Sequence, residues 1–288
     1  MARSVILVLH PSRPEAHEWA RRVVKDLISR HIEVLTSSEV EIQGVVKKTE
    51  LELKKSVGNC ELVLVLGGDG TILRGAEIAH SSDVPVLGVN LGHVGFLAQI
   101  NRPTIDLLVE AIDLKKYKTE RRMTLAYKIE RNGALVGEGW ALNEVAVERN
   151  TESMIELFVQ IDGRPLSRWG CDGVICATPT GSTAYAFSAG GPVVWPDVEA
   201  LVLLPLAAHA LFSDPMVVSP ESEIAIDVES DTGVISADGL RKFQLSAGDR
   251  VLLTSEKTFV SLAHLEDIAF TDRLVAKFKL PVDGWRGE

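Results

Sequence analysis

Residues 67–71, Gly-Gly-Asp-Gly-Thr, carry the strongest chemical signal in the sequence. They follow five consecutive apolar residues, 62–66, and precede a segment with helical spacing. Three glycines let the backbone approach a phosphate closely, and a following helix offers free N–H groups. Asp69 would repel phosphate there unless it accepts a proton or binds a metal ion, so its natural roles are general base or Mg²⁺ ligand. The alternative is a glycine-rich turn in which Asp69 only caps the helix.

Two other phosphate-binding patterns fail on this loop. The sequence contains no Gly-Lys dipeptide, which argues against a P-loop. Leu73 stands where a Gly-x-Gly-x-x-Gly dinucleotide fingerprint needs its third glycine.

A second glycine-rich segment, residues 88–97, follows another short apolar run. Because the carboxyl ends of parallel strands share one sheet edge, we expect this segment to reach the same crevice as the first loop. Phe96 would suit stacking on a flat ligand, although a lone aromatic is more often part of a core. His93 fits a phosphate contact and a solvent-facing position equally well.

Asn143 and Glu144 interrupt an otherwise apolar segment, residues 140–148, which we predict to be one strand. Adjacent side chains of a strand point to opposite faces, so at least one of them enters an interior or a cleft. A buried carboxylate needs hydrogen-bond donors, and ribose hydroxyls would serve. A bulge or an exposed strand edge is the alternative.

The densest cluster lies in residues 170–192, where glycines and small hydroxyl residues surround Tyr185. This composition favours a tight polar ligand pocket over a packed core. A serine hydrolase has to be considered, because residues 186–190, Ala-Phe-Ser-Ala-Gly, resemble a nucleophile elbow around Ser188. Ala186 replaces the first glycine of that motif, and the segment does not lie cleanly between a strand and a helix, so we disfavour this alternative.

Alternating periodicities indicate which elements hold the first two loops. Apolar runs at 5–9, 32–35, 62–66 and 84–89 predict strands, and residues 14–30, 51–57 and 72–80 have helical spacing. Strand and helix in alternation predict a parallel, Rossmann-like α/β domain over residues 1–118.

Short strands and turn signals fill the next part of the chain. Asn132-Gly133 and Asp162-Gly163 are hairpin signals between predicted strands, and further strands are expected at 224–228, 240–245, 250–253 and 259–263. The pattern predicts an all-β sandwich over residues 119–266. Residues 267–280 have helical spacing, and we expect the tail, 267–288, to return to the α/β domain.

Composition bounds the classes of function. The 288 residues carry a net charge of −10, which argues against nucleic acid and anionic membranes as partners, and an acidic protein needs a local device to bind an anion. The longest apolar stretch, 200–212, contains Pro205 and His209 and is not a membrane span. Cys60, Cys171 and Cys176 fit no metal motif, so we predict buried thiols and a cytoplasmic location.

Four segments in this order resemble the NAD kinases: residues 67–71, 90–97, 143–144 and 172–192. Gly-Gly-Asp-Gly-Thr alone also resembles the glycine-aspartate loops of lipid kinases and phosphofructokinases, whereas residues 178–185, Thr-Pro-Thr-Gly-Ser-Thr-Ala-Tyr, are more specific to NAD kinases. The resemblance implies transfer of the γ-phosphoryl group of ATP, or of polyphosphate, to the 2′-hydroxyl of the adenosine ribose of NAD. It also implies Mg²⁺ arriving with ATP and a homodimer or homotetramer.

The resemblance assigns roles residue by residue. Asp69 is the expected base. The expected nucleotide-binding residues are Gly67, Gly68, Gly70, Thr71, Phe96, Asn143, Glu144, Asp172, Thr183, Ala184, Tyr185 and Ser188.

The sequence departs from the family at two positions outside these motifs. Asp214 stands where relatives often place an arginine, which puts an anion contact from residues 209–215 in doubt, and Leu240 replaces a glutamine that often follows Asp-Gly. Asp214 leaves a non-catalytic NAD-binding sensor open as an alternative. The low specificity of the glycine loop leaves open a kinase for another hydroxyl acceptor, such as a lipid or sugar.

Overall fold

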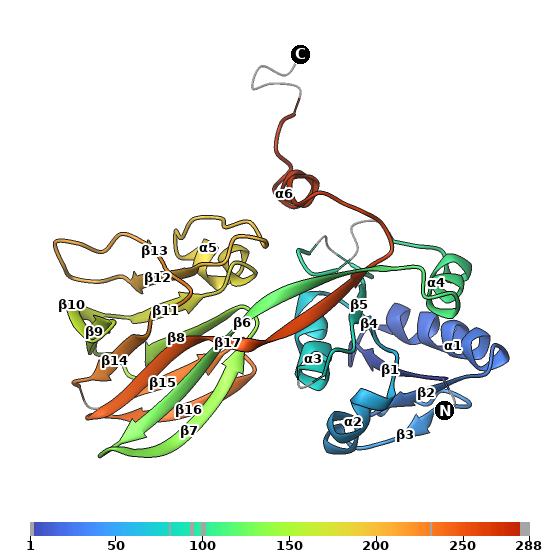
Figure 1. Ribbon diagram of the computed structural model, residues 1–288, viewed down its shortest axis with the longest axis horizontal. Helices are drawn as coiled ribbons and strands as arrows, with labels where there is room; N and C mark the ends of the chain where they lie inside the picture. The colour runs from blue at the N-terminus through green and yellow to red at the C-terminus, as the bar shows by residue number, and fades with distance from the viewer. Residues whose placement is uncertain (1–2, 81, 93–94, 99–101, 231, 283–288) are drawn as a thin grey trace. The chain divides into compact units, whose positions relative to one another are not determined.

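The computed structural model describes residues 3–80, 82–92, 95–98, 102–230 and 232–282, and His93 lies outside them. The described residues form two compact units, one of residues up to 121 and from 260 onward, the other of residues 122–259 (Figure 1). Two strands, β6 (Lys118–Arg131) and β17 (Asp249–His264), contribute residues to both units. We call the first of the two units the α/β unit and the second, residues 122–259, the β unit.

The α/β unit is built on a parallel sheet, which confirms the fold predicted for this part of the chain. Its strand order is β3-β2-β1-β4-β5, and the end of β17 pairs parallel with β5. The strands are β1 (Arg3–Leu9), β2 (Ile32–Thr36), β3 (Val46–Lys47), β4 (Leu62–Leu66) and β5 (Val86–Val89). The helices are α1 (Pro14–Ser29), α2 (Glu50–Ser56), α3 (Asp69–Ala79), α4 (Ile105–Asp113) and α6 (Phe270–Phe278), with a 3-10 turn at Val57–Asn59.

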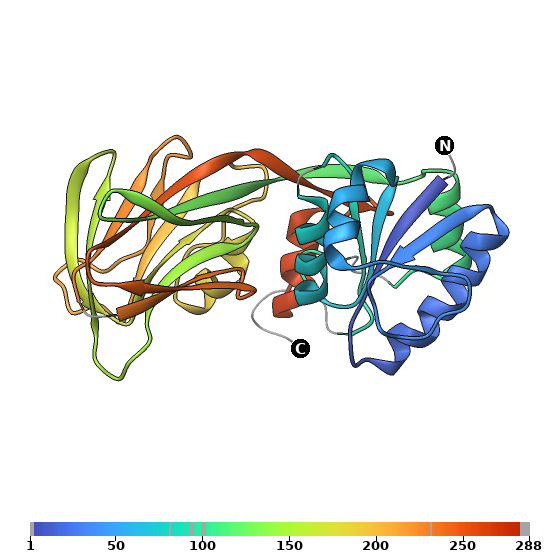
Figure 2. The ribbon, with the colours of Figure 1, turned by 90° about the horizontal axis from the view of Figure 1, so that it is seen from below.

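Local sequence explains these elements. All five residues of β4 are apolar and buried, as expected for a strand covered on both faces. Helix α1 begins with Pro14 at its first turn, where the missing N–H costs nothing, and it buries Trp19, Val23 and Leu27 against the sheet. Figure 2 shows these helices around the sheet within the α/β unit.

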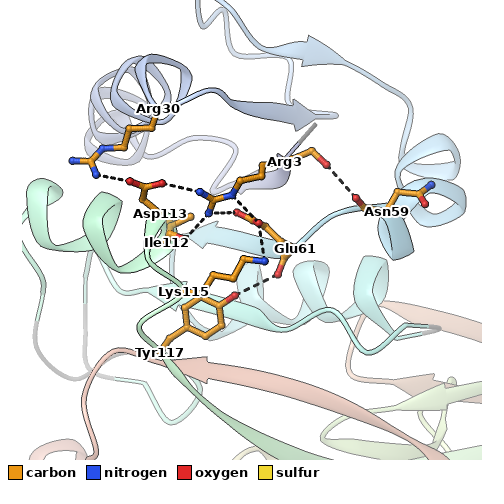
Figure 3. A network of polar contacts seen from close by, with 9 residues as sticks. Arg3, Arg30, Asn59, Glu61, Ile112, Asp113, Lys115 and Tyr117 are labelled. Carbon is orange, nitrogen blue, oxygen red and sulfur yellow. Dashed lines mark hydrogen bonds and ion pairs between the residues drawn. The ribbon is translucent and has the colours of Figure 1, made fainter. Parts of the chain in front are cut away.

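A network of ion pairs joins the elements at the amino end of the parallel strands (Figure 3). Arg3, the first residue of β1, lies 2.8 Å from Glu61 Oε1 and 2.7 Å from Asp113 Oδ1. Arg30 Nη1 lies 2.8 Å from Asp113 Oδ2, and Lys115 Nζ lies 3.2 Å from Glu61 Oε2. Hydrogen bonds from Arg30 and Arg3 lower the pKa of Asp113 below its ordinary value. At this end of the sheet each of these three cations has an anionic partner.

The β unit is a sandwich of two antiparallel sheets, as predicted. One has the order β10-β9-β14-β17, with β6 beside β17 and β7 beside β6, and the other has the order β13-β12-β11-β8-β15-β16. Both sheets contribute to one core around the fully buried Trp169. The remaining strands are β7 (Ala134–Ala141), β8 (Glu144–Arg149), β9 (Ile155–Ile161), β10 (Arg164–Cys171), β11 (Gly173–Ala177), β12 (Leu201–Leu206), β13 (Met216–Val218), β14 (Ile224–Val228), β15 (Thr232–Ala237) and β16 (Arg241–Ser246).

The two predicted hairpin turns are confirmed. Asn132 and Gly133 have φ of 51° and 76°, and Asp162 and Gly163 have φ of 52° and 72°. Positive φ at both central residues matches the right-handed twist of the flanking strands, and Asn, Asp and Gly tolerate it best.

One strand prediction in the β unit is wrong. Residues 249–264 form a single strand of 16 residues where two short strands were predicted. The two predicted strands followed two separate apolar runs, but the polar residues between these runs stay in the same strand, which pairs with β6. Thr124 Oγ1 donates to the carbonyl of Thr258 at 2.6 Å and lies 2.9 Å from Glu256 Oε2.

All three cysteines are buried and unpaired, as predicted. Burial raises the pKa of Cys171 to about 11 and that of Cys176 to about 12, so both remain thiols at neutral pH. Among the residues that the structure describes, none of the helices combines the length and apolar character needed to cross a bilayer.

Candidate active site

The glycine loop lies at the carboxyl end of β4, and α3 follows it directly. The helix begins at Asp69, three residues before the predicted start at Ile72, with Gly68 as its N-cap. The prediction was wrong because apolar periodicity starts only at Ile72. The first turn needs no apolar residue, since its N–H groups have no partner within the helix. Gly70 therefore belongs to the first turn.

The three glycines of the loop differ in what they offer a ligand. The N–H of Gly67 donates to Val89 O at 3.1 Å, and a Cβ there would lie 2.4 Å from Thr71 Oγ1. Gly67 is thus required by the packing of Thr71, which is buried. The N–H groups of Gly68 and Gly70 have no partner among the described residues, and a Cβ on either would meet nothing within 4 Å. Unpartnered amides at the start of a helix, with no side chain beside them, suit an anion.

The second glycine-rich segment wraps the carboxylate of Asp69. Phe96 N–H donates to Oδ2 at 2.9 Å, and Leu97 N–H donates to Oδ1 at 3.2 Å. A Cβ on Gly95 would lie 2.1 Å from Oδ1, so only glycine fits there. The expectation that the two loops meet is confirmed, and these bonds fix the orientation of the carboxylate.

The ring of Phe96 faces the C-terminal tail. It is 7% exposed, and its centroid lies 6.0 Å from that of Phe270 and 5.8 Å from that of Phe278. Arg273 of the same helix donates to the carbonyls of Phe96, at 3.1 Å, and Ala98, at 2.8 Å. The tail helix α6 therefore holds the segment that holds Asp69, and these contacts account for the ring of Phe96 as part of the core.

In the β unit, residues 142–143 separate two strands that were predicted to be one. Asp238 causes the break: its carboxylate accepts from the N–H groups of Leu142, at 2.9 Å, and Asn143, at 2.7 Å. Amides captured by a carboxylate cannot join a ladder, so β7 ends at Ala141 and β8 begins at Glu144.

The same turn is joined to the 178–185 segment. Thr178 N–H donates to Asn143 O at 2.8 Å, and Thr178 Oγ1 donates to Leu142 O at 2.6 Å. A Cβ on Gly181 would lie 2.0 Å from Asn143 O. The Asn143-Glu144 motif and the 178–185 segment, 35 residues or more apart in sequence, therefore lie next to each other in the β unit.

Glu144 is 8% exposed, and its environment disfavours its charge. Burial, followed by the charges of Asp238 and Glu148, raises its pKa to about 8, against an opposing hydrogen bond from the backbone of Tyr185. Its Oε2 is buried and has no hydrogen-bond partner within the described part of the chain. A protonated carboxyl with an unused oxygen is able to hydrogen-bond a ligand hydroxyl.

Residues 181–188 form a 3-10 turn, Gly181–Thr183, and a short helix, α5 (Tyr185–Ser188). Tyr185 is 39% exposed, and its hydroxyl donates to Glu148 Oε1 at 2.8 Å. Burial and the Glu148 carboxylate raise the pKa of Tyr185 to about 12. Thr183 and Ala184 are half-buried, and Ser188 is exposed.

Asp172 lies where β10 turns into β11. Its Oδ1 is 2.6 Å from Arg149 Nε, and its charge acts on the hydroxyl of Tyr185, as do those of Glu148 and Glu144. Asp172 thus belongs to the same surroundings as Tyr185 although the five residues of β11 separate their segments.

Models of protein families match both units. The ATP-NAD kinase N-terminal domain matches residues 5–117, and the ATP-NAD kinase C-terminal domain matches residues 142–265. The chain belongs to the NAD kinase family. NAD kinase 2 of Streptomyces avermitilis is 50% identical over 294 residues, covering 99% of this chain and 97% of the relative. NAD kinase of Mycobacterium tuberculosis is 47% identical over 303 residues, covering 99% of both chains.

Two solved structures of NAD(H) kinases are similar to this chain. Yeast NADH kinase complexed with NADH has a TM-score of 0.86 and 25% identity, and the match covers 99% of this chain and 89% of the other. An NAD kinase from Archaeoglobus fulgidus in complex with ATP has a TM-score of 0.72 and 27% identity, covering 96% and 98%. Family membership and fold therefore agree.

Glu148 and Asp238 of this NAD kinase family member were not among the predicted site residues. A signal for Glu148 was present, because Glu144 and Glu148 are four residues apart on one strand and share a face. Nothing local pointed to Asp238, which acts 95 residues away from Asn143. Of the two departures, Asp214 lies in an exposed loop and Leu240 is 41% exposed in the turn after Asp238.

Proposed function

We propose that this chain phosphorylates the 2′-hydroxyl of the adenosine ribose of NAD with ATP, giving NADP and ADP. The observation that carries the proposal is the geometry of Asp69. Its carboxylate is oriented by two backbone N–H groups and lies in the first turn of α3, whose neighbouring Gly68 and Gly70 have N–H groups without a partner among the described residues. This arrangement combines a base with an anion-binding backbone.

In the proposed reaction, Asp69 accepts the proton of the 2′-hydroxyl while the 2′-oxygen of the ribose attacks the γ-phosphorus. The new O–P bond forms as the bond between the γ-phosphorus and the β–γ bridging oxygen breaks, and ADP leaves with the electron pair. The amides of Gly68 and Gly70 would hold phosphate oxygens. Asn143, Glu144, Asp172, Thr183, Ala184, Tyr185 and Ser188 are the proposed NAD-contacting residues.

A divalent cation belongs to the same proposal. The described residues contain no group of three or more His, Cys, Asp or Glu side chains that would hold a metal ion. Phosphate oxygens would therefore supply most ligands of a Mg²⁺ ion, with Asp69 the one carboxylate within the glycine loop, and the ion would neutralise phosphate charge. Asp69 fits this task because carboxylate oxygens are ligands that Mg²⁺ prefers.

Substitution of Asp69 by asparagine tests the assignment. Asp69→Asn keeps the size of the side chain but removes the base and one of its two acceptor oxygens, so we expect turnover to fall by roughly 10²- to 10⁴-fold. NAD binding should stay close to that of the unchanged protein, whereas thermal stability should fall slightly, because the asparagine NH₂ group faces one of the two backbone N–H groups that the carboxylate accepts. Asp106→Asn, which alters an exposed first-turn aspartate of α4, is the matched control.

NADP formation is measured with purified protein, NAD, Mg²⁺ and either ATP or polyphosphate. Near-normal turnover by Asp69→Asn would reject Asp69 as the base. Phosphorylation of a lipid or sugar, or NAD binding with no product from either donor, would reject the NAD kinase assignment. The same assay with NADH tests the acceptor seen in the yeast structure.

Assembly and location complete the proposal. We infer a homodimer or homotetramer in the cytoplasm, and the similarity to family members along the whole chain supports this. Sedimentation equilibrium of the purified protein measures the assembly, and a monomer at micromolar concentration would contradict it.

A further inference from the structure

Cationic side chains gather at the carboxyl end of the parallel sheet, next to the glycine loop. His10 and Arg13 follow β1, and Arg74 lies on α3. His10 N–H donates to Leu66 O at 3.0 Å, so the segment after β1 lies directly beside the end of β4. Three cationic or titratable groups from two segments are thus placed near the backbone that we propose as the phosphate site.

The guanidinium of Arg13 is packed against the second glycine-rich segment. A Cβ on Gly92 would lie 2.4 Å from Arg13 Nη1, so the absence of a side chain at 92 makes room for it. Nη1 is buried and has no hydrogen-bond partner among the described residues. A buried cationic donor without a partner is costly, and an anion bound there would remove that cost.

The electrostatic field at the carboxyl end of the parallel sheet is positive. The pKa of His10 is lowered, first by burial and then by the charges of Arg13, Arg74 and His17. No ion pair to Arg13 or Arg74 is found in the part of the chain that the structure describes. The amino end of the same sheet is the reverse, because Arg3, Arg30 and Lys115 all have carboxylate partners there (Figure 3).

We propose that Arg13 and Arg74, with His10, form the subsite for the condensed phosphate chain of the donor. The proposal rests on the proposed function and names the side chains that its donor would meet. The 90–97 segment links the two parts, since it touches Arg13 at Gly92 and Asp69 at Phe96 and Leu97. The planar guanidinium of arginine matches phosphate oxygens in pairs, which amides alone do not offer.

Substitution of Arg13 tests the subsite by kinetics and by direct binding. For Arg13→Gln we expect the KM for ATP to rise about 10- to 100-fold, with the KM for NAD unchanged. Calorimetric titration with inorganic tripolyphosphate should show the same loss of affinity. Arg74→Gln, on an exposed residue, should give a smaller loss, and Arg13→Lys an intermediate one.

Arg22→Gln is the matched control, because it removes an exposed positive charge from α1 more than two turns away from Arg13. If Arg13→Gln fails to fold, Gly92→Ala gives a second test, since its methyl group would displace the guanidinium and should weaken tripolyphosphate binding. A folded Arg13→Gln variant that binds tripolyphosphate within twofold of the unchanged protein would overturn the proposal. So would a loss that affects ATP but not tripolyphosphate.

The outcomes separate this inference from the proposed function. If the unchanged protein makes no NADP but Arg13→Gln loses tripolyphosphate binding, the NAD kinase assignment fails and the subsite stands. If NADP forms and donor binding is unaffected by Arg13→Gln, the assignment stands and the subsite fails.

Discussion

Glu144 shows how strongly a single environment changes the chemistry of a residue. Its carboxyl is nearly fully buried beside Asp238 and Glu148, and its pKa rises from 4.5 to about 8. At neutral pH the side chain is therefore mostly protonated and is able to donate a hydrogen bond. A neutral acid also avoids adding a third negative charge to that region. A ribose hydroxyl fits such a partner better than a phosphate does.

This raised pKa predicts a pH-dependent stability. The folded protein retains the Glu144 proton between pH 4.5 and about 8, whereas the unfolded chain has released it. The contribution of Glu144 to the free energy of unfolding is therefore full below about pH 4.5 and is lost as pH rises through about 8. For Glu144→Gln, which cannot ionise, we expect a gain in stability over the unchanged protein that is larger at about pH 9 than at about pH 5.

Urea denaturation at both pH values measures this difference. Glu138→Gln, at an exposed glutamate on β7, serves as the control, and its stability relative to the unchanged protein should not vary with pH. A constant difference for Glu144→Gln would contradict the raised pKa.

At the scale of elements, α6 completes the site in the α/β unit. Arg273 is 3% exposed and donates to the carbonyls of Phe96 and Ala98. It also lies 3.2 Å from His264 Nδ1, which accepts because arginine only donates. His264 Nε2 in turn lies 3.3 Å from Glu120 Oε2. The end of the chain thus fixes the segment that orients Asp69.

Removal of this guanidinium should reduce turnover without removing any group of the reaction. Arg273→Leu leaves two buried carbonyls without their donor, which costs roughly 1–3 kcal/mol each, and frees the 95–98 segment. We expect kcat to fall and the melting temperature to drop, with addition of guanidinium ion restoring part of the turnover. Thr271→Ala, at an exposed position on the same helix, should change neither. An unchanged kcat in a folded Arg273→Leu variant would show that α6 does not position Asp69.

At the scale of the whole molecule, the two units differ in how the chain builds them. The β unit is one continuous stretch, residues 122–259, with its own core around Trp169. The α/β unit needs two stretches, because β17 supplies Leu262 and Ala263 beside β5 and α6 supplies Arg273. The ends of the continuous stretch lie on neighbouring strands, β6 and β17.

This difference predicts that the two units differ in their ability to fold alone. Residues 122–259 expressed alone should fold and unfold in one cooperative transition, because a domain with its own core folds by itself. Residues 1–121 expressed alone should be much less stable, since they lack the strand and helix from the other stretch. Circular dichroism during heating measures both. A non-cooperative melt for residues 122–259 would contradict the prediction.

Local patterns were sufficient for most of the fold. Apolar runs such as residues 62–66, helical spacing after Pro14 and the turns at Asn132-Gly133 and Asp162-Gly163 depend on neighbours within a few residues. They determined the parallel α/β unit, the antiparallel sandwich and the position of the glycine loop where a strand leads into a helix. The same local patterns failed where a polar run stayed inside β17 and where α3 began before its apolar stripe.

The sequence by itself determined which residue types stand at the ends of the strands, and with them the family. Only the tertiary structure decided what each of them does there. The carbonyl of Val89 accepts the N–H of Gly67, so that group is not free for a ligand. Helix α6 covers the ring of Phe96, and the carboxylate of Asp238 ends β7 before Asn143. Arg13 belongs to no sequence motif, and only the fold places its guanidinium against Gly92. The physical reason is separation along the chain: these partners lie 22 to 182 residues apart, so no local periodicity records them, whereas hydrogen bonds and burial depend only on distance in space.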